Sequence, residues 1–259
     1  MLELNHIYKT FNKNKNKNPN ELFNDFNLKI GTGEFVTVIG SNGSGKSTLL
    51  NLICGNTFPD SGEIIFKGEN ITNVKEYKRY RRIGRVFQNP AFGNCSNMTV
   101  LENLMLAENK NRPWNLKKMK DSSKVKFVEM LKPIELGLEN KLSSSIDDLS
   151  GGQRQAVSLL MTTLSDIELL VLDEHTAALD PKTGEKVMQI TKKIVEERKL
   201  TTIMITHNLE HALAYGNRII MLHEGEIILD LSGEEKEKIK MDDILNLFNQ
   251  ISIRRGNSV

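Results

Sequence analysis

The segment GEFVTVIGSNGSGKSTLLNLICG, residues 33–55, constrains the fold of this chain more than any other stretch. Its first eight residues form an apolar run that indicates a buried strand. The glycine-rich turn that follows leads into residues suited to a helix. A strand, loop and helix in this order predict an α/β fold in which the strand belongs to a buried sheet.

The turn itself, GSNGSGKS, matches the pattern G-x-x-x-x-G-K-[ST] and predicts a phosphate-binding loop. Its glycines allow consecutive backbone N–H groups to point at phosphate oxygens, Lys46 reaches the outer phosphates, and the Ser47 hydroxyl can ligate Mg²⁺. A flexible Gly/Ser turn is the structural alternative, and the position between strand and helix argues against it. The residues assigned to the phosphates are Gly40, Ser41, Asn42, Gly43, Ser44, Gly45, Lys46, Ser47 and Thr48.

The stretch LLVLDEH, residues 169–175, supplies the acidic groups that such a loop requires. A phosphate loop works with a metal-holding carboxylate, which usually ends a buried strand of the same sheet. Asp173 ends such a run and is predicted to hold Mg²⁺, directly or through water. Glu174 points to the other side of the strand's end and is predicted to polarise the attacking water as general base. His175 is then neither nucleophile nor relay.

A nucleophile triad and a zinc site are the alternatives for these acidic and histidine residues. A Ser or Cys triad requires a nucleophile elbow, and GSGKS lacks the final glycine of G-x-S-x-G. His207 and His211 in HNLEH lie four residues apart and could face one zinc ion, but the glutamate of H-E-x-x-H is missing. A histidine on a helix surface is the structural alternative for His211.

The segment LSGGQRQ, residues 149–155, predicts a second anion site. Ser150 can cap a helix whose first N–H groups bind an anion, with the two glycines permitting close approach. One nucleotide does not need two such sites in one chain, so we expect a symmetric dimer in which this segment covers the phosphates held by the partner. A plain glycine-rich helix start is the structural alternative. The assigned residues are Ser150, Gly151, Gly152 and Gln153.

Patterning along the rest of the chain predicts an α/β core interrupted by helices. Residues 75–150 are mostly helical in pattern, with an amphipathic stretch at Val125, Val128 and Leu131. Asp180 and Pro181 open a later helix, and RIIML and EIILD flank HEG as a hairpin. Further strands are predicted at residues 2–8, 26–30, 169–172 and 202–206, with apolar helix faces at Val187, Ile190 and Ile194 and at Ile244, Leu247, Phe248 and Ile251.

Composition excludes few functions. The 35 Lys+Arg against 33 Asp+Glu give a net charge of +2, which does not mark a nucleic-acid binder. Cys54 and Cys95 lack metal-ligand spacing and are expected to be reduced, structural cysteines. No signal-peptide core or membrane-spanning apolar run is visible. The polar run KNKNKNPN at residues 13–20 predicts an exposed loop, with a basic binding arm as the alternative.

With GSNGSGKS, LSGGQRQ, LLVLDEH and ITHN in this order, the chain resembles the ATP-binding cassette (ABC) superfamily over essentially its full length. The resemblance implies a P-loop NTPase core with a mixed sheet at residues 1–88 and 149–259, and a helical subdomain at residues 89–148 that contacts a permease. It implies ATP and Mg²⁺ as cofactors.

The same resemblance implies further roles. Gln88 resembles the residue that senses Mg²⁺ and contacts the transmembrane partner, and Asp180 resembles the D-loop residue. His207 resembles the switch histidine that contacts the γ-phosphate. Phe11, with Tyr8 as the alternative, resembles the aromatic that stacks on adenine. The chain departs from the family where His175 replaces the commoner Pro or Ala, and where residues 13–20 follow Phe11.

DEHTAALDP, FQNPAFGNCSNMTVLENL and THNLEHALAYGNRIIMLHEGEI are also similar to a narrower group of bacterial importer ATPases. These accompany a permease of the ribose and branched-chain amino-acid type and a substrate-binding lipoprotein, and are linked to tryptophan or tyrosine uptake. The likeness implies an ATPase at the cytoplasmic face of the membrane, dimeric, bound to a permease and only indirectly to a substrate-binding protein. An exporter or lipoprotein-release ATPase and a soluble ABC ATPase are the alternatives. Repair versions of the latter generally carry a long coiled-coil or DNA-binding insertion that this sequence lacks.

Overall fold

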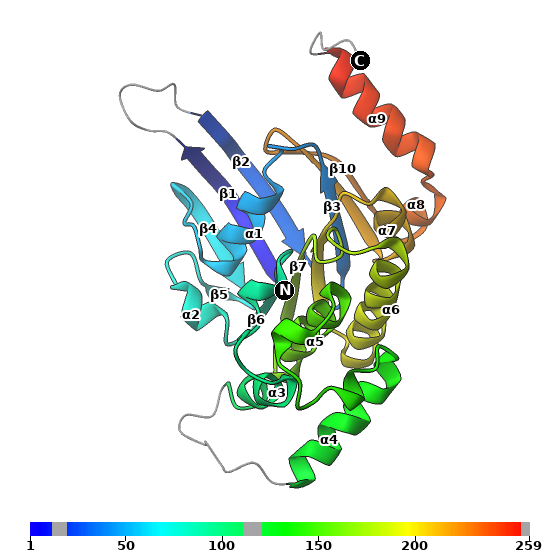
Figure 1. Cartoon of the computed structure of the whole chain (residues 1–259). Helices are drawn as coiled ribbons and strands as arrows, with labels where there is room; N and C mark the ends of the chain where they lie inside the picture. The colour runs from blue at the N-terminus through cyan, green and yellow to red at the C-terminus, as the bar shows by residue number, and fades with distance from the viewer. Residues whose placement is uncertain (12–19, 111–120, 255–259) are drawn as a thin grey trace.

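The computed structural model describes residues 1–11, 20–110 and 121–254 and contains two sheets flanked by helices (Figure 1). One sheet is antiparallel, in the order β2-β1-β4-β5. The other is mixed, in the order β10-β9-β3-β8-β7-β6, with only the β10–β9 pair antiparallel. The strands are β1 Leu2–Phe11, β2 Asn20–Ile30, β3 Phe35–Gly40, β4 Ser61–Phe66, β5 Glu69–Asn70, β6 Ile83–Val86, β7 Leu169–Asp173, β8 Thr201–Ile205, β9 Arg218–His223 and β10 Glu226–Ser232.

The central strands of the mixed sheet are almost wholly buried because helices or the other sheet cover both of their faces. In β7, Leu169 and Val171 point to one hydrophobic cluster, while Leu170 and Leu172 point to another. Alternate side chains of a strand face opposite sides, so a strand buried on both sides favours apolar residues at every position. This explains the LLVL run.

Helix α1, Lys46–Cys54, packs in the cluster between the two sheets. Its Leu49, Leu50 and Leu52 lie in the same cluster as Leu4 of β1 and Val38 of β3. The helix directly follows β3 through the loop at residues 41–45. Burial between two sheets therefore fixes the position of the residues that begin this helix.

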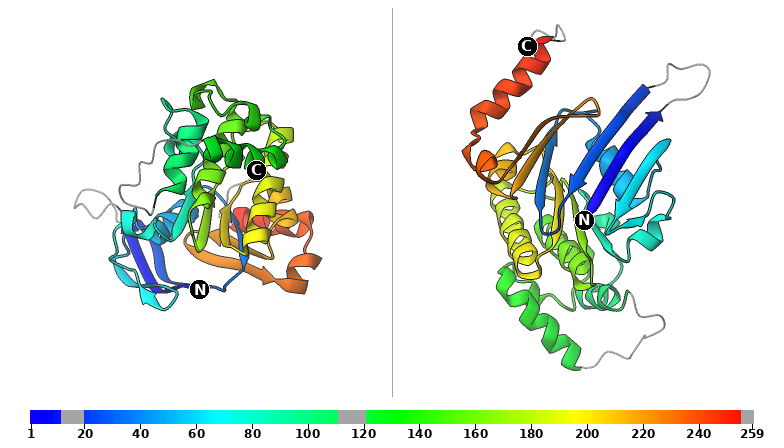
Figure 2. Two further views of the ribbon diagram at one scale, coloured as in Figure 1. Left: turned by 90° about the horizontal axis from the view of Figure 1, so that it is seen from below. Right: turned by 180° about the vertical axis from the view of Figure 1, so that it is seen from behind.

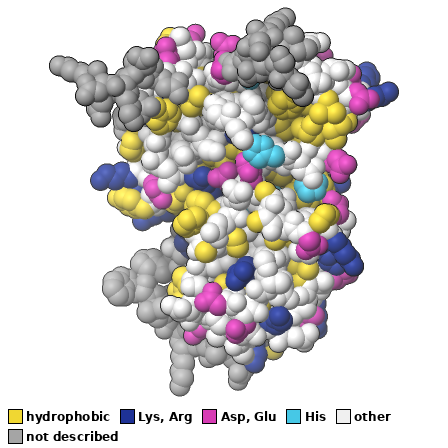
Figure 3. Space-filling model, turned by 45° about the horizontal axis from the view of Figure 1, so that its top comes forward, with side chains coloured by type: hydrophobic (Ala, Val, Ile, Leu, Met, Phe, Trp, Pro, Cys, Tyr) yellow, Lys and Arg dark blue, Asp and Glu magenta, His cyan; other side chains and the backbone are white. Residues whose placement is uncertain are grey.

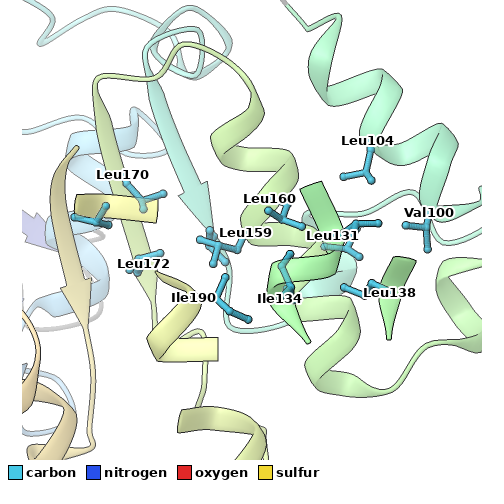
Figure 4. Packing of buried hydrophobic residues seen from close by; sticks show 14 of the residues in the cluster. Val100, Leu104, Leu131, Ile134, Leu138, Leu159, Leu160, Leu170, Leu172 and Ile190 are labelled. Atoms are coloured by element: carbon cyan, nitrogen blue, oxygen red, sulfur yellow. The ribbon is translucent and has the colours of Figure 1, made fainter. Parts of the chain in front are cut away.

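The opposite face of the mixed sheet is covered by α5, Gly151–Leu164, and α6, Pro181–Arg198. Helices α3, Val100–Glu108, and α4, Asp121–Leu131, extend the same hydrophobic cluster away from the sheet (Figure 4). Short 3-10 turns complete this part. They are η1 Pro90–Phe92, η2 Lys132–Ile134, η3 Leu138–Asn140 and η4 Ile146–Asp148.

The remaining helices lie at the ends of the fold. Helices α7, Leu209–Ala214, and α9, Met241–Arg254, share a small cluster with β3 and β9. Figure 1 and the right-hand view of Figure 2 show α9 at the opposite end of the molecule from α3 and α4. The other two helices are α2 Glu76–Arg79 and α8 Gly233–Lys238.

Most predicted elements are present, but several predictions were wrong in detail. The segment predicted to be mostly helical contains β6, and β2 begins at Asn20 rather than near Phe26. In α4 the side chain of Val125 is 62% exposed, whereas Phe127 is fully buried beside Leu131. The predicted apolar face of this helix, Val125, Val128 and Leu131, was therefore wrong at Val125. The three-residue spacing omitted Phe127, which fills the core.

Three further expectations concern segments outside the described residues, the two cysteines and membrane spans. Residues 13–19 of the KNKNKNPN run and the side chain of Ile251 lie outside the described residues. Cys54 is free and buried, and Cys95 is free and exposed. Within the described ranges, none of the helices has the length and apolar character needed to cross a membrane.

Candidate active site

Four neighbouring strands place the predicted chemical groups at one edge of the mixed sheet. Strands β3, β8, β7 and β6 are adjacent and parallel, and Asp173 pairs with Ile205, which pairs with Val38. Loops that leave the carboxyl ends of parallel strands meet at the same edge. These loops carry the phosphate-loop sequence at residues 40–47 after β3, His207 after β8, Glu174 after β7 and Gln88 after β6.

The loop at residues 40–47, called the phosphate loop below, has the turned backbone that its glycines predict. Gly40, Gly43 and Gly45 have φ values of 151°, 80° and 106°, a region that favours glycine. A Cβ at Gly40 would lie 2.2 Å from the carbonyl oxygen of Leu222, whereas a Cβ at Gly43 would meet nothing within 4 Å. The loop is therefore packed against β9 at its base and open at its tip.

Lys46 begins α1 and turns its side chain back across the phosphate loop. Its ammonium Nζ donates hydrogen bonds to the carbonyl oxygens of Gly40, at 2.8 Å, and Ser41, at 2.9 Å. Burial lowers the pKa of Lys46, and the charge of Glu174 partly offsets this effect. The loop thus holds a cation and a helix N-terminus together, which is the arrangement that attracts phosphate.

A contact that sequence reasoning missed braces the phosphate loop from outside. The backbone N–H of Gly225, in the turn between β9 and β10, donates to the carbonyl oxygen of Ser44 at 2.9 Å. A Cβ at Gly225 would lie 1.5 Å from the carbonyl oxygen of Leu22, so only glycine fits between the loop and β2. The HEG turn of the predicted hairpin therefore supports the phosphate loop.

Asp173 ends β7 as predicted, and its carboxylate is held by an arginine that the sequence analysis did not assign. Arg85 Nη2 of β6 donates to Asp173 Oδ2 at 2.6 Å, and the two side chains are 8% and 17% exposed. Arg85 Nη1 also donates to Asn51 Oδ1 of α1 at 2.9 Å. The contact of Arg85 with Asp173 was not predicted because β6 overlaps the basic run RYRRIGR, where the pattern predicts mostly helix.

Glu174 and His207 lie together. The carboxylate oxygen Glu174 Oε1 lies 2.7 Å from His207 Nε2. Glu174 has a φ of 47°, which is rare and strained for a residue with a side chain. Asp173 and Glu174 thus turn to opposite neighbouring strands, one toward β6 and the other toward the loop after β8, as predicted. In the space-filling view, histidine side chains lie beside acidic ones near the middle of this face (Figure 3).

The two histidines of HNLEH contact different carboxylates. His207 meets Glu174, whereas His211 Nε2 lies 3.5 Å from Glu185 Oε2 of α6. His211 also packs edge-on against Tyr215. The pair therefore does not converge on one point as a zinc site requires.

His175, the residue that departs from the family pattern, is buried with 2% exposure. The Thr191 hydroxyl donates to the carbonyl oxygen of Val187, so its oxygen accepts from His175 Nε2 at 3.2 Å. Burial, with a smaller contribution from His211, lowers the pKa of His175 to about 3. The side chain is therefore a neutral anchor that ties the Glu174 segment to α6.

Ser150 and Asp180 act as helix caps, as predicted. The Ser150 hydroxyl accepts from the backbone N–H of Gln153, whose side chain completes a capping box at the start of α5. Asp180 Oδ1 accepts from the backbone N–H of Thr183 at the start of α6. A Cβ at Gly152 would lie 2.0 Å from Thr183 Cγ2. Gly152 is thus required by the close approach of these two helix starts, whatever it contributes to anion binding.

Apart from the phosphate loop and Asp173, the assigned residues are found at three places. Glu174, Asp180 and His207 line one cavity of about 570 Å³, whereas Gln88, Gly151 and His175 line another of about 330 Å³. Phe11 lies at the end of β1, 38% exposed, with Lys9 Nζ 5.4 Å from its ring centroid. Gln155, which was not assigned, donates from Nε2 to the carbonyl oxygen of Phe87 and so anchors the segment before Gln88.

The donor set fits a nucleotide with Mg²⁺. Ser47 is exposed at the start of α1, and Asp173 ends the strand that pairs with β8. A hydroxyl and a carboxylate are oxygen ligands of the kind that Mg²⁺ prefers. The open tip of the phosphate loop and the Lys46 ammonium provide the complementary surface for phosphate oxygens.

Comparisons with known proteins agree on one family. A family profile described as ABC transporter matches residues 23–177. The tyrosine transport ATP-binding protein of Clostridioides difficile is 48% identical over 248 residues, which cover 96% of this chain and 98% of the relative. The phosphonates import ATP-binding protein PhnC of Lactobacillus acidophilus is 36% identical, over 86% and 87% of the two chains. The solved dimeric structure of the ATP-binding cassette MJ0796, in a post-hydrolysis state bound to ADP and Pi, matches with a TM-score of 0.75 and 33% identity, over 90% of this chain and 98% of that one.

Proposed function

Because the chain belongs to the ABC transporter family, we propose that it is the ATP-hydrolysing subunit of an importer whose cargo is an aromatic amino acid. Tyrosine is the first candidate for this cargo. One observation supports the cargo, the 48% identity to the tyrosine transport ATP-binding protein across nearly the full length of both chains. The ATPase chemistry is supported by the meeting of the phosphate loop, Asp173, Glu174 and His207 at one sheet edge.

Each group has a distinct part in hydrolysis. The phosphate loop and Lys46 would bind the phosphates, and Phe11 would stack on the adenine. Ser47 and Asp173 would hold Mg²⁺, and Gln88 would sense the bound metal. Mg²⁺ supplies charge neutralisation at the reacting phosphate when it is bound. Glu174 takes the proton of the attacking water. His207, whose Nε2 lies 2.7 Å from Glu174 Oε1, orients the Glu174 carboxylate and contacts the γ-phosphate.

We infer that two copies share two nucleotides. The α5 N-terminus, with Ser150 exposed at its cap, presents backbone N–H groups that one chain does not use for its own phosphate loop. In the proposed dimer, residues 150–153 of one copy cover the phosphates bound by the other, with Asp180 at the contact. The dimeric state of the solved cassette MJ0796 supports this arrangement.

We also propose that the helical part, residues 89–148, receives a permease at the cytoplasmic face of the membrane. Phe92, four residues after Gln88, is 75% exposed in η1. A permease contact here would lie next to the residue assigned to Mg²⁺, so nucleotide binding and transport would be coupled over a short path. A substrate-binding protein would engage the permease rather than this chain.

Uptake of labelled tyrosine tests the cargo and the direction together. Cells lacking this protein should take up tyrosine more slowly, the wild-type chain should restore uptake, and Lys46→Ala should not because phosphate binding is lost. Excess unlabelled tryptophan and phenylalanine define the breadth of the cargo. Unchanged uptake in the deletion strain would refute tyrosine as cargo, and faster accumulation would indicate an exporter.

A further inference from the structure

Arg85 is the charged side chain that the function above does not use, although it touches the proposed Mg²⁺ ligand. It lies two residues after Ile83 on β6, and Asp173 lies two residues after Val171 on β7. Ile83 and Val171 both belong to the cluster around α1. Side chains two residues apart on a strand share a face, so Arg85 and Asp173 both point toward the helix that carries the phosphate loop.

The guanidinium of Arg85 is held from several sides. Nη2 donates to Asp173 Oδ2 at 2.6 Å, and Nη1 donates to Asn51 Oδ1 at 2.9 Å and Asn56 Oδ1 at 3.1 Å. The Phe87 ring lies under the guanidinium, with its centroid 4.8 Å from Cζ. Arg85 thereby joins Asp173 to α1 and to the residue that precedes Gln88.

This contact has a direct consequence for metal binding. One carboxylate oxygen, Oδ2, is occupied by the guanidinium, and no described residue donates a hydrogen bond to Oδ1. A divalent cation at the same carboxylate is repelled by the arginine, and with both side chains less than 20% exposed the repulsion is only weakly screened. Phosphate groups of a bound nucleotide add the negative charge that offsets this repulsion.

We propose that Arg85 is a positioning residue that holds Asp173 by Oδ2, leaves Oδ1 for Mg²⁺, and prevents Asp173 from binding a divalent cation before ATP arrives. The metal then enters the site with the nucleotide. This inference rests on the proposed role of Asp173 as a Mg²⁺ ligand. A purely structural ion pair would stabilise the fold without changing the affinity of the empty site for metal.

Mn²⁺ binding without nucleotide, measured by electron paramagnetic resonance, distinguishes the two roles. Arg85→Gln should bind Mn²⁺ about tenfold more tightly than the wild type, because removing a nearby positive charge is worth at least that factor. Arg85→Met keeps an unbranched chain beside Phe87 without the charge and should show the same gain. Arg85→Lys keeps the charge and should resemble the wild type.

Two further variants serve as controls. Arg82 lies three residues before Arg85 and outside the site, where it forms a salt bridge with Glu168. Arg82→Gln removes this salt bridge and should leave Mn²⁺ binding unchanged. Adding Asp173→Asn to Arg85→Gln should abolish the gain.

The possible outcomes separate this inference from the function on which it rests. No gain in either neutral variant, or an equal gain in Arg85→Lys, would overturn the role of Arg85. A gain that survives Asp173→Asn would place the metal elsewhere and so reject Asp173 as the ligand. ATP hydrolysis by the wild type is a separate measurement, and its absence would reject the ATPase assignment alone.

Discussion

At the scale of single residues, the acidic pair at the end of β7 shows how neighbouring side chains acquire different tasks. Asp173 contacts Arg85 on one neighbouring strand, while Glu174 contacts His207 beyond the other. The left-handed backbone of Glu174 redirects its side chain at the point where the strand ends. Backbone strain at such a position is common where a side chain must be aimed at a reacting group.

His175 adds a pH dependence to stability. Its pKa is about 3 when folded against an ordinary value of 6.5, so the unfolded chain takes up the proton first as the pH falls. The contribution of neutral His175 to the free energy of unfolding is fully present above pH 6.5. It is lost progressively as the pH falls from 6.5 to 3. At pH 5.5 the loss should be roughly 1 kcal/mol.

Urea unfolding of the wild type and His175→Asn at pH 8 and pH 5.5 measures this loss. The variant lacks the titrating ring, so the acid-induced decrease in its free energy of unfolding should be smaller by that amount. Equal decreases in both proteins would show that His175 is not responsible.

At the scale of elements, the core connects the helical part to the sheet. Leu131 of α4 is fully buried in the same cluster as Leu170 and Leu172 of β7. Leu131→Ala should therefore lower the free energy of unfolding by about 2–5 kcal/mol, through lost burial and a residual cavity.

The matched control lies on the same helix. Val125 is 62% exposed, so Val125→Ala should change the free energy of unfolding by less than about 0.5 kcal/mol. Chemical denaturation of both variants gives the comparison. A similar cost at the two positions would mean that α4 does not pack as described.

Sequence patterning predicted the central elements well because their signals are local. The phosphate loop needs glycines at positive φ, the LLVL run needs two covered faces, and Ser150 and Asp180 cap helices with their own side chains. The antiparallel strand β4 and the short β6 were not predicted. Four residues of strand inside a basic run carry too little periodicity to be distinguished from a helix.

The candidate site could be predicted residue by residue but not contact by contact. Arg85, Gly225 and Gln155 touch site residues that are distant in sequence, and only the folded arrangement brings them together. The contacting residues are 68 residues apart for Gln155 and Phe87, 88 apart for Arg85 and Asp173, and farther apart still for Gly225 and Ser44. Local pattern carries no signal over such separations.

At the scale of the whole molecule, the proposed ATPase site is complete only when a second copy supplies residues 150–153. Glu174→Gln keeps the shape of the side chain but removes the general base, which should slow ATP hydrolysis about 100-fold or more. ATP would then persist in the site and hold two copies together.

The most direct test is the molar mass of Glu174→Gln by light scattering, with and without ATP and Mg²⁺. We expect the 29.3 kDa monomer without nucleotide and twice that mass with ATP. A second substitution, Lys46→Ala, should abolish the dimer because phosphate binding is lost. A monomer that persists when ATP saturates the protein would contradict the shared site, and hydrolysis by Glu174→Gln at the wild-type rate would contradict the general base.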